Sequence, residues 1–140
     1  MKGSYFLVIK LDEVREVKTK GRAFRLRPGY YVYVGSAMNS LEKRVLRHFR
    51  KNKKLHWHID FLLKEAELLR AYLIPSDKRL EEELSLEVSK RGEPVPGFGA
   101  SDIKVGTNLY FFREEPDEAL VEILKGLGLD WKIVKSEEEI

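Results

Sequence analysis

The stretch over residues 29–60 constrains the fold of this chain most, because two different periodicities meet in it. Residues 30–34, YYVYV, are aromatic and β-branched, and this composition predicts a strand. A turn of small residues follows, and then apolar side chains recur at helical spacing at Leu41, Val45 and Phe49. A strand that leads directly into an amphipathic helix predicts a domain of mixed α and β structure.

The same patterns predict the remaining elements. Asn39 is the expected N-cap of the basic helix, with Glu42 completing a box-like cap. Strands are predicted over residues 4–11, 14–27 (a hairpin broken at Lys20-Gly21), 30–34, 67–74 and 109–112, and helices over residues 39–51, 57–63, 78–90 and 117–125. This order predicts an α+β fold: a small, mostly antiparallel sheet flanked by helices, with an extra C-terminal helix.

Length and composition predict one domain over residues 1–140, with residues 113–140 as a C-terminal helical extension packed on it. The absence of Cys excludes disulfides, thiolate catalysis and Cys-bound zinc. The absence of Gln, with many charged residues, is typical of thermophilic proteins. The first residues form no signal-peptide pattern and no apolar run could span a bilayer, so a cytoplasmic location without membrane contact is expected.

Charge is distributed unevenly along the chain. Residues 1–54 hold 15 Lys/Arg and 4 Asp/Glu, a net of +11, whereas residues 113–140 hold 4 and 9, a net of −5. A basic half joined to an acidic tail is typical of an anion-binding face, although a solvated, salt-bridged surface gives the same counts. The cations expected to follow a nucleic-acid backbone are Lys43, Arg47, Arg50, Lys51, Lys53 and Lys54.

Four residues around the strand-to-helix junction suit phosphodiester chemistry. Arg44 and His48 are four residues apart on the basic helix and share one face; a guanidinium matches phosphate oxygens, and an imidazole relays protons. Tyr33 ends the preceding strand and Tyr5 lies in the first, so their phenols approach each other if these strands pair. A phenol becomes a useful base only where its pKa is lowered. An ordinary helix flank and two strand-edge tyrosines would give the same pattern.

Two groups of residues are candidate metal ligands. Glu81 lies beside the apolar stripe of the helix predicted over residues 78–90, and a carboxylate there needs a divalent cation or a basic side chain as partner. Glu83 and Glu87 lie on the other flank. In the segment HWHID, residues 56–60, an extended backbone would align the ligands His56, His58 and Asp60. No other ligand cluster accompanies them, which favours a brace for the basic helix with Trp57 buried.

Several of these segments resemble the GIY-YIG nuclease superfamily. Gly3-Ser4-Tyr5 and Tyr33-Val34-Gly35 resemble its paired signatures. Arg44 and His48 resemble its Arg that is followed one turn later by His. EEEL, residues 81–84, resembles its metal-binding motif. The DUF123 branch of that superfamily resembles this chain to about Phe112, in the segments YVYVGSA (31–37), RHF (47–49), HWHID (56–60) and PGFGASD (96–102). Members of this branch occur alone or fused to repair glycosylases of the endonuclease III type.

The resemblance implies a one-metal endonuclease that hydrolyses phosphodiester bonds during DNA repair or processing, with DNA favoured over RNA as substrate. Arg44 would stabilise the scissile phosphate and Glu81 would hold one Mg²⁺ (or Mn²⁺) per site. Tyr5 or Tyr33 would activate water, with His48 tuning the phenol. Asn108 would act as a ligand or position a phosphate. An endonuclease III-type glycosylase is the candidate protein partner.

The chain departs from the family pattern at a few positions. Ser4 replaces the Ile of the first signature, and Ile103, Val105 and Asn108 stand where the branch usually has Cys residues and a His. Two other functions stay open at this level. One is a nucleic-acid-binding module that keeps the basic face without catalysis, and the other is a metal-dependent hydrolase centred on the HWHID segment. Convergence of Arg44, Glu81 and a phenol in one cleft would favour the nuclease.

Overall fold

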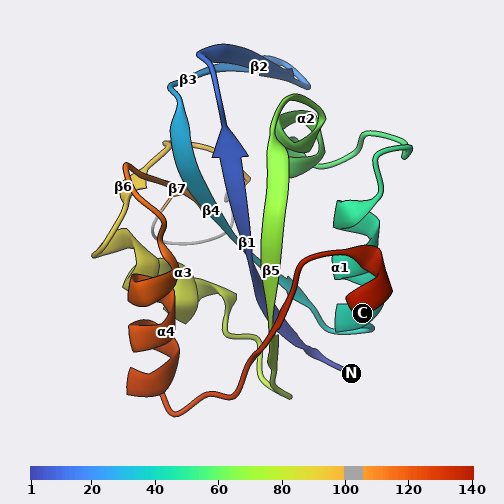
Figure 1. Cartoon of the computed structure of the whole chain (residues 1–140), viewed down its shortest axis with the longest axis vertical. Coiled ribbons are helices and arrows are strands. Elements are labelled where there is room, and N and C mark those ends of the chain that lie inside the picture. Colours follow the sequence, from blue (N-terminus) through green and yellow to red (C-terminus); the bar gives the residue numbers. More distant parts are fainter. Residues whose placement is uncertain (100–105) are drawn as a thin grey trace.

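One antiparallel sheet forms the centre of the protein, as the computed structural model of residues 1–99 and 106–140 shows (Figure 1). The strand order is β6-β7-β4-β1-β5-β8, and a separate hairpin pairs β2 with β3. The strands are β1 (Gly3–Leu11), β2 (Arg15–Thr19), β3 (Arg22–Leu26), β4 (Gly29–Ala37), β5 (Glu67–Pro75), β6 (Glu93–Pro94), β7 (Leu109–Phe112) and β8 (Lys132–Val134). The predicted α+β fold is confirmed.

Helices cover both faces of the sheet. They are α1 (Leu41–Phe49), α2 (His58–Glu65), α3 (Glu81–Ser89) and α4 (Asp117–Gly126), with a short 3₁₀ turn, η1 (Glu137–Glu139), near the C-terminus. The helices α1 and α2 pack on one face and α3 and α4 on the other (Figure 1). None of the helices within the described ranges 1–99 and 106–140 has the length and apolar character needed to cross a bilayer.

The central strand β1 contributes to two hydrophobic cores. Tyr5, Leu7 and Ile9 point into the core under α1, α2 and the β2–β3 hairpin, whereas Phe6 and Val8 point into the core under α3 and α4. Since both faces are covered, the strand is apolar without interruption from Tyr5 to Ile9, and all of these residues are buried. The strand is therefore a rigid base for its functional side chains.

Some element boundaries differ from the prediction. The N-cap of α1 is Ser40, whose Oγ accepts from the backbone N–H of Lys43 at 3.2 Å, while Asn39 lines the cleft described below. The helix α1 ends at Phe49, and α3 begins only at Glu81. The strand over 109–112 is not the last one, because β8 pairs with β5. The apolar spacing of Leu120, Ile123, Leu124 and Leu127 predicts that all four lie on the buried face of α4, but Leu127 is 42% exposed because the helix has already ended.

Candidate active site

A cleft of about 430 Å³ opens where β4 ends and the chain turns into α1. It gathers side chains from both faces of the sheet, because α1 and α3, which cover opposite faces, both contact β4. Its walls include Tyr5, Tyr33, Gly35, Ser36, Arg44, Trp57, Arg79, Glu81, Gly99 and Asn108. The structure thus brings both candidate phenols, the candidate phosphate-binding arginine, the candidate metal-binding glutamate and Asn108 into one cleft.

Ser36 connects Arg44 and Glu81 through its backbone carbonyl and its side-chain hydroxyl. Its carbonyl accepts a hydrogen bond from Nη1 of Arg44 at 3.1 Å, and its Oγ donates to Oε1 of Glu81 at 2.9 Å. Arg79 adds a longer bond, from its Nη1 to the same Oγ at 3.4 Å. A guanidinium and a carboxylate are therefore held on opposite ends of one residue, without a direct ion pair that would neutralise them.

Glu81 is the only one of the three candidate glutamates that lines the cleft. Glu83 is exposed, and Glu87 forms an ion pair with Lys90 at 2.9 Å. The second carboxylate oxygen of Glu81 accepts from Nδ2 of Asn108 at 3.2 Å, and that amide also donates to the carbonyl of Gly99. Hydrogen bonds to both oxygens fix the orientation of the carboxylate.

Gly35 allows the phenol of Tyr5 to cross β4. The two residues are directly opposite in the β1–β4 pairing, so their side chains would share one face of the sheet. A Cβ at Gly35 would lie under 3.0 Å from Cζ and Oη of Tyr5. The glycine that closes the Tyr33-Val34-Gly35 signature thus has a steric role: it provides the space through which Tyr5 reaches the cleft.

Gly35→Ala is therefore expected to displace the Tyr5 ring and to lower the free energy of unfolding by about 1–3 kcal/mol. Gly126→Ala is the matched control, because a Cβ there meets nothing within 4 Å and the position is helical. It should be neutral or stabilise by about 0.5–1 kcal/mol. Urea unfolding of both variants measures the difference, and equal stabilities would contradict the steric role.

Tyr5 and His48 form a buried pair behind the cleft. Tyr5 Oη lies 2.8 Å from His48 Nε2, and His48 is 2% exposed. Burial lowers the pKa of His48 to about 3, an effect to which the charge of Lys53 adds, so the imidazole is neutral at pH 7. Burial also raises the pKa of Tyr5 and of Tyr33, and the charge of Arg44 opposes this rise in both. The imidazole contact distinguishes Tyr5 from Tyr33.

The neutral state of His48 predicts loss of stability in mild acid. Its pKa in the unfolded chain is 6.5 and in the folded protein about 3, so below pH 6.5 protons bind the unfolded chain preferentially. Unfolding free energy should fall by roughly 2 kcal/mol from pH 6.5 to about pH 4.5. His58, whose pKa burial also lowers, contributes with the same sign. Urea titrations across this range should give a shallower slope for His48→Phe than for wild type, and an unchanged slope would contradict the assignment.

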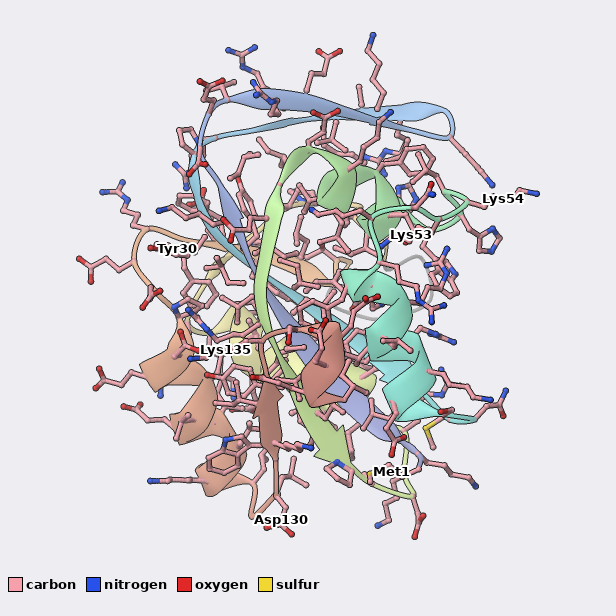
Figure 2. All side chains as sticks on the ribbon, turned by 45° about the vertical axis from the view of Figure 1, so that its right-hand side comes forward. Met1, Tyr30, Lys53, Lys54, Asp130 and Lys135 are labelled. Carbon is pink, nitrogen blue, oxygen red and sulfur yellow. The ribbon has the colours of Figure 1, made fainter. Side chains whose placement is uncertain are left out.

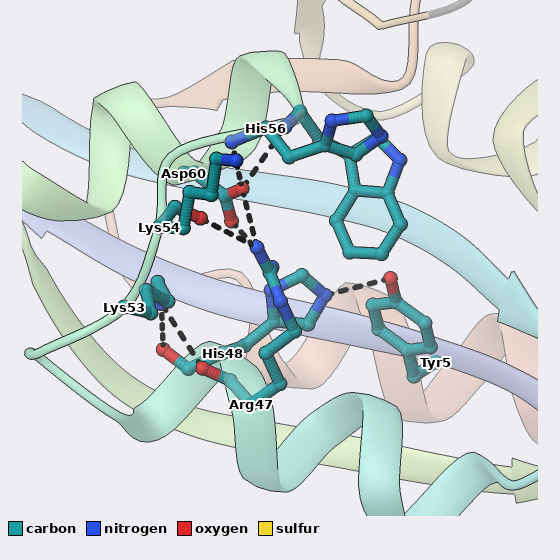
Figure 3. A network of polar contacts seen from close by, with 8 residues as sticks. Tyr5, Arg47, His48, Lys53, Lys54, His56 and Asp60 are labelled. Atoms are coloured by element: carbon teal, nitrogen blue, oxygen red, sulfur yellow. Dashed lines mark hydrogen bonds and ion pairs between the residues drawn. The ribbon is translucent and has the colours of Figure 1, made fainter.

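The HWHID segment braces α1 through Asp60 (Figure 3). Asp60 is fully buried and accepts from both terminal nitrogens of Arg47, at 2.8 and 2.9 Å, and from the backbone N–H groups of His56 and Trp57. The ring of Trp57 lies 4.5 Å from the guanidinium carbons of Arg47 and Arg44. The predicted brace is present, and it also fixes Arg44 at the cleft, but Trp57, predicted to be buried, is only partly buried because it lines the cleft.

These contacts correct two predictions. His56, His58 and Asp60 do not converge: within residues 1–99 and 106–140 no three His, Asp or Glu side chains are grouped as metal ligands, and His58 instead packs against Phe24 and Phe98. The hydrolase centred on HWHID is therefore contradicted. Arg47 and Lys53 do not face outward either, because Arg47 pairs with Asp60, and Lys53 donates to the last carbonyls of α1.

Comparison with known proteins identifies the family. A family model described as "Domain of unknown function DUF123" matches residues 4–129. This chain belongs to the DUF123 family. A search of curated proteins and a search of solved structures found no match. The family match continues beyond Phe112 and includes α4, so this helix is part of the DUF123 domain itself and not an addition to it.

The basic surface of the DUF123 domain is smaller than the sequence suggests. Of the six cations expected to follow a nucleic-acid backbone, Lys43, Arg50, Lys51 and Lys54 are exposed. Arg50 lies 3.6 Å from Glu137 of the acidic tail. The loop from Arg50 to Trp57 carries the exposed Lys54 away from α1 (Figure 2), whereas the side chain of Lys53 is bonded back to that helix. This leaves an exposed cationic edge made of Lys43 on α1 and of Arg50, Lys51 and Lys54 in the segment that follows the helix.

Sequence reasoning missed Ser36 and Arg79 as residues of the cleft. Arg79 lies two residues before Glu81, and Ser36 directly follows the second signature, so proximity to these motifs was the available signal. The positions Ala100, Ser101, Asp102, Ile103 and Val105 lie outside the described residues.

Proposed function

We propose that this DUF123 domain is a divalent-metal-dependent endonuclease that hydrolyses phosphodiester bonds in DNA, in repair or processing. One observation carries the proposal: Ser36 holds Arg44 and Glu81 in one cleft, beside the Tyr5–His48 pair. A guanidinium, a carboxylate and a phenol are the groups that metal-assisted attack on a phosphodiester needs. Their convergence was the condition that separated the nuclease from the other interpretations.

The donor groups fit one Mg²⁺ or Mn²⁺. Glu81 supplies a carboxylate, and Oδ1 of Asn108 is buried without a hydrogen-bond partner in the part of the chain that the structure describes. Mg²⁺ is commonly held by one or two carboxylates together with water and substrate phosphate. Glu81 and Asn108 are the residues that would hold it. When bound, the cation polarises the phosphate and stabilises negative charge on the leaving oxygen.

The arginines would orient the scissile phosphate. Arg44 keeps one terminal nitrogen on the Ser36 carbonyl and lies over Trp57, so its guanidinium is presented to the cleft in a fixed plane. Arg79 also lines the cleft, two residues before Glu81, and contacts the Oγ of the same Ser36. The two guanidinium groups would bind the phosphate and stabilise the charge that develops as water attacks phosphorus and the leaving P–O bond breaks.

The proton of the attacking water would pass to Tyr5. As Tyr5 Oη accepts this proton, its own proton moves to Nε2 of His48, 2.8 Å away, so no free phenolate accumulates. The leaving oxygen takes a proton from solvent. Tyr5 therefore acts at the cleft, and His48 is a positioning and proton-accepting residue behind it.

Charge and family resemblance support a DNA substrate. The exposed cations beside α1 would contact the backbone without reading sequence, which predicts salt-sensitive binding. DNA is favoured over RNA because members of the resembled branch occur fused to endonuclease III-type glycosylases. Such a glycosylase is the protein partner that we propose.

A second function, nucleic-acid binding without catalysis, is favoured by the protonation state of the two phenols. Burial raises the pKa of both Tyr5 and Tyr33 above the usual 10, so each keeps its proton at neutral pH. The neutral, buried His48 is also a weak proton acceptor. A binding module would need only the cationic edge beside α1.

The deciding experiment is a cleavage assay on a panel of nucleic acids. Single-stranded, duplex, flapped, branched and abasic DNA, and RNA, are incubated with Mg²⁺, Mn²⁺ or EDTA. Glu81→Gln is compared with Glu83→Gln, which makes the same change of charge two residues along on an exposed position. We expect metal-dependent cleavage of DNA that is lost in Glu81→Gln and retained in Glu83→Gln.

The other outcomes each exclude one interpretation. Cleavage that survives Glu81→Gln points to a contaminating enzyme or to another site, and it overturns the proposed active site. Tight binding of the panel without cleavage under any metal condition supports the binding module. Preferential cleavage of RNA would retain the nuclease and overturn the assignment of its substrate.

A further inference from the structure

A second cavity, of about 600 Å³, lies between α1, the loop that follows it and α2. His48 lines this cavity, whereas its hydrogen-bond partner Tyr5 lines the cleft. Figure 3 shows Lys53 and Tyr5 on opposite sides of the imidazole. The Tyr5–His48 pair thus separates two hollows, and the proposed nuclease uses only one of them.

The walls of this cavity combine cations with an apolar surface. The basic side chains are Arg50, Lys51, Lys53 and Lys64, and the apolar ones are Phe49, Leu55, Leu63 and Leu68. The acidic side chains are Asp60, which Arg47 neutralises, and Glu67. Arg50 lies 3.6 Å from Glu137, but Lys51, Lys53 and Lys64 still outnumber the one remaining carboxylate, Glu67, and an apolar surface lies beside them. This combination suits a ligand with a negatively charged head and an apolar body.

Two buried groups facing this region have unused hydrogen-bonding capacity. His48 is 2% exposed, and its Nδ1 has no partner among the described residues. The half-buried ammonium of Lys53 donates to the carbonyls of Arg47 and His48, which leaves it one further proton to donate. Burial lowers the pKa of Lys53 to about 8, and a neighbouring anion would favour its charged form.

We infer that this cavity is a binding site for a small aromatic phosphate of the size of a nucleoside monophosphate. The phosphate contacts Lys51, Lys53 and Lys64, and the aromatic body lies against Phe49 and Leu68. A volume of this order is typical of small-molecule sites. The site is separate from the cleft, and its occupation does not require the proposed nuclease activity.

The test is isothermal titration calorimetry of the full chain with AMP, in EDTA at physiological salt. Inorganic phosphate tests binding of the charged head alone, and adenosine tests binding of the uncharged body alone. The double variant Lys51→Ala/Lys64→Ala removes two exposed cations of the cavity. Lys125→Ala/Lys132→Ala removes two exposed cations elsewhere. Arg44→Ala disables the cleft. Thermal melts verify that each variant is folded.

We expect one AMP per chain, bound more tightly than either fragment. The cavity variant should weaken binding about tenfold or more, whereas the control double variant and Arg44→Ala should change it less than about twofold. The ring signals of His48 should shift in the NMR spectrum as AMP binds. Binding lost in Arg44→Ala but kept in the cavity variant would place AMP in the cleft. Equal weakening in both double variants, or no saturation at millimolar AMP, would overturn the inference.

Discussion

Arg44→Ala is expected to lower kcat for DNA cleavage by about 10³-fold or more while leaving the fold intact. The guanidinium is partly exposed, lines the cleft and is held by the Ser36 carbonyl at 3.1 Å and by the ring of Trp57. A side chain fixed in this way is oriented before the substrate arrives, so its loss removes stabilisation of charge that develops at the phosphate. The loss should therefore fall mainly on kcat and much less on KM.

Two variants sharpen this prediction. Arg44→Lys keeps the positive charge but loses the planar fork, so it should recover only a small part of the rate. Lys43→Ala removes the adjacent, exposed cation of α1 and should raise KM slightly, in a salt-dependent manner, without changing kcat. Single-turnover cleavage with enzyme in excess over DNA, measured over a series of enzyme concentrations and at two salt concentrations, separates these effects. Equal losses in Arg44→Ala and Lys43→Ala would mean that Arg44 contributes only general electrostatic attraction.

Local pattern predicts the fold well where one element determines its own structure. The uninterrupted apolar run in β1 and the alternation of Phe24 and Leu26 with arginines in β3 both gave strands where strands are present. Pattern fails where a distant partner imposes the structure. The strand β4 continues through Gly35 to Ala37, residues of low strand propensity, because they pair with Gly3 to Tyr5. The strand β8, of three residues, exists through its pairing with β5.

The same distinction between local pattern and distant partner applies to the residues of the candidate site. The spacing of Arg44 and His48 correctly places both on the inner flank of α1, one at the cleft and one buried behind it. Helical periodicity also predicts that the side chain of Arg47 points away from the protein. This prediction is wrong because the loop after α1 folds back and places Asp60 beside Arg47, which the periodicity of the helix cannot indicate. The contact between Arg79 and Ser36 likewise joins residues 43 positions apart, which no local pattern encodes.

Asp60→Ala is expected to be the most destabilising single substitution, with a loss of about 3–5 kcal/mol in the free energy of unfolding. The carboxylate is fully buried and accepts four hydrogen bonds, so its removal leaves the guanidinium of Arg47 without its counter-charge and two backbone N–H groups without acceptors. For a domain whose total stability is on the order of 5–15 kcal/mol, this is a large fraction.

The ion pair of Glu87 with Lys90 provides the comparison, because it is on the surface of α3 and Glu87→Ala should cost less than about 1 kcal/mol. Burial raises the pKa of Asp60, but bonds from Arg47, Trp57 and His56 outweigh it and lower the pKa to about 2. The contribution of Asp60 is therefore fully present above its unfolded pKa of 3.8 and is lost as pH falls towards 2. Urea unfolding at neutral pH measures both variants. Similar losses for the two would mean that Arg47 and the N-terminus of α2 find other partners, and that Trp57 and Arg44 are positioned without the brace.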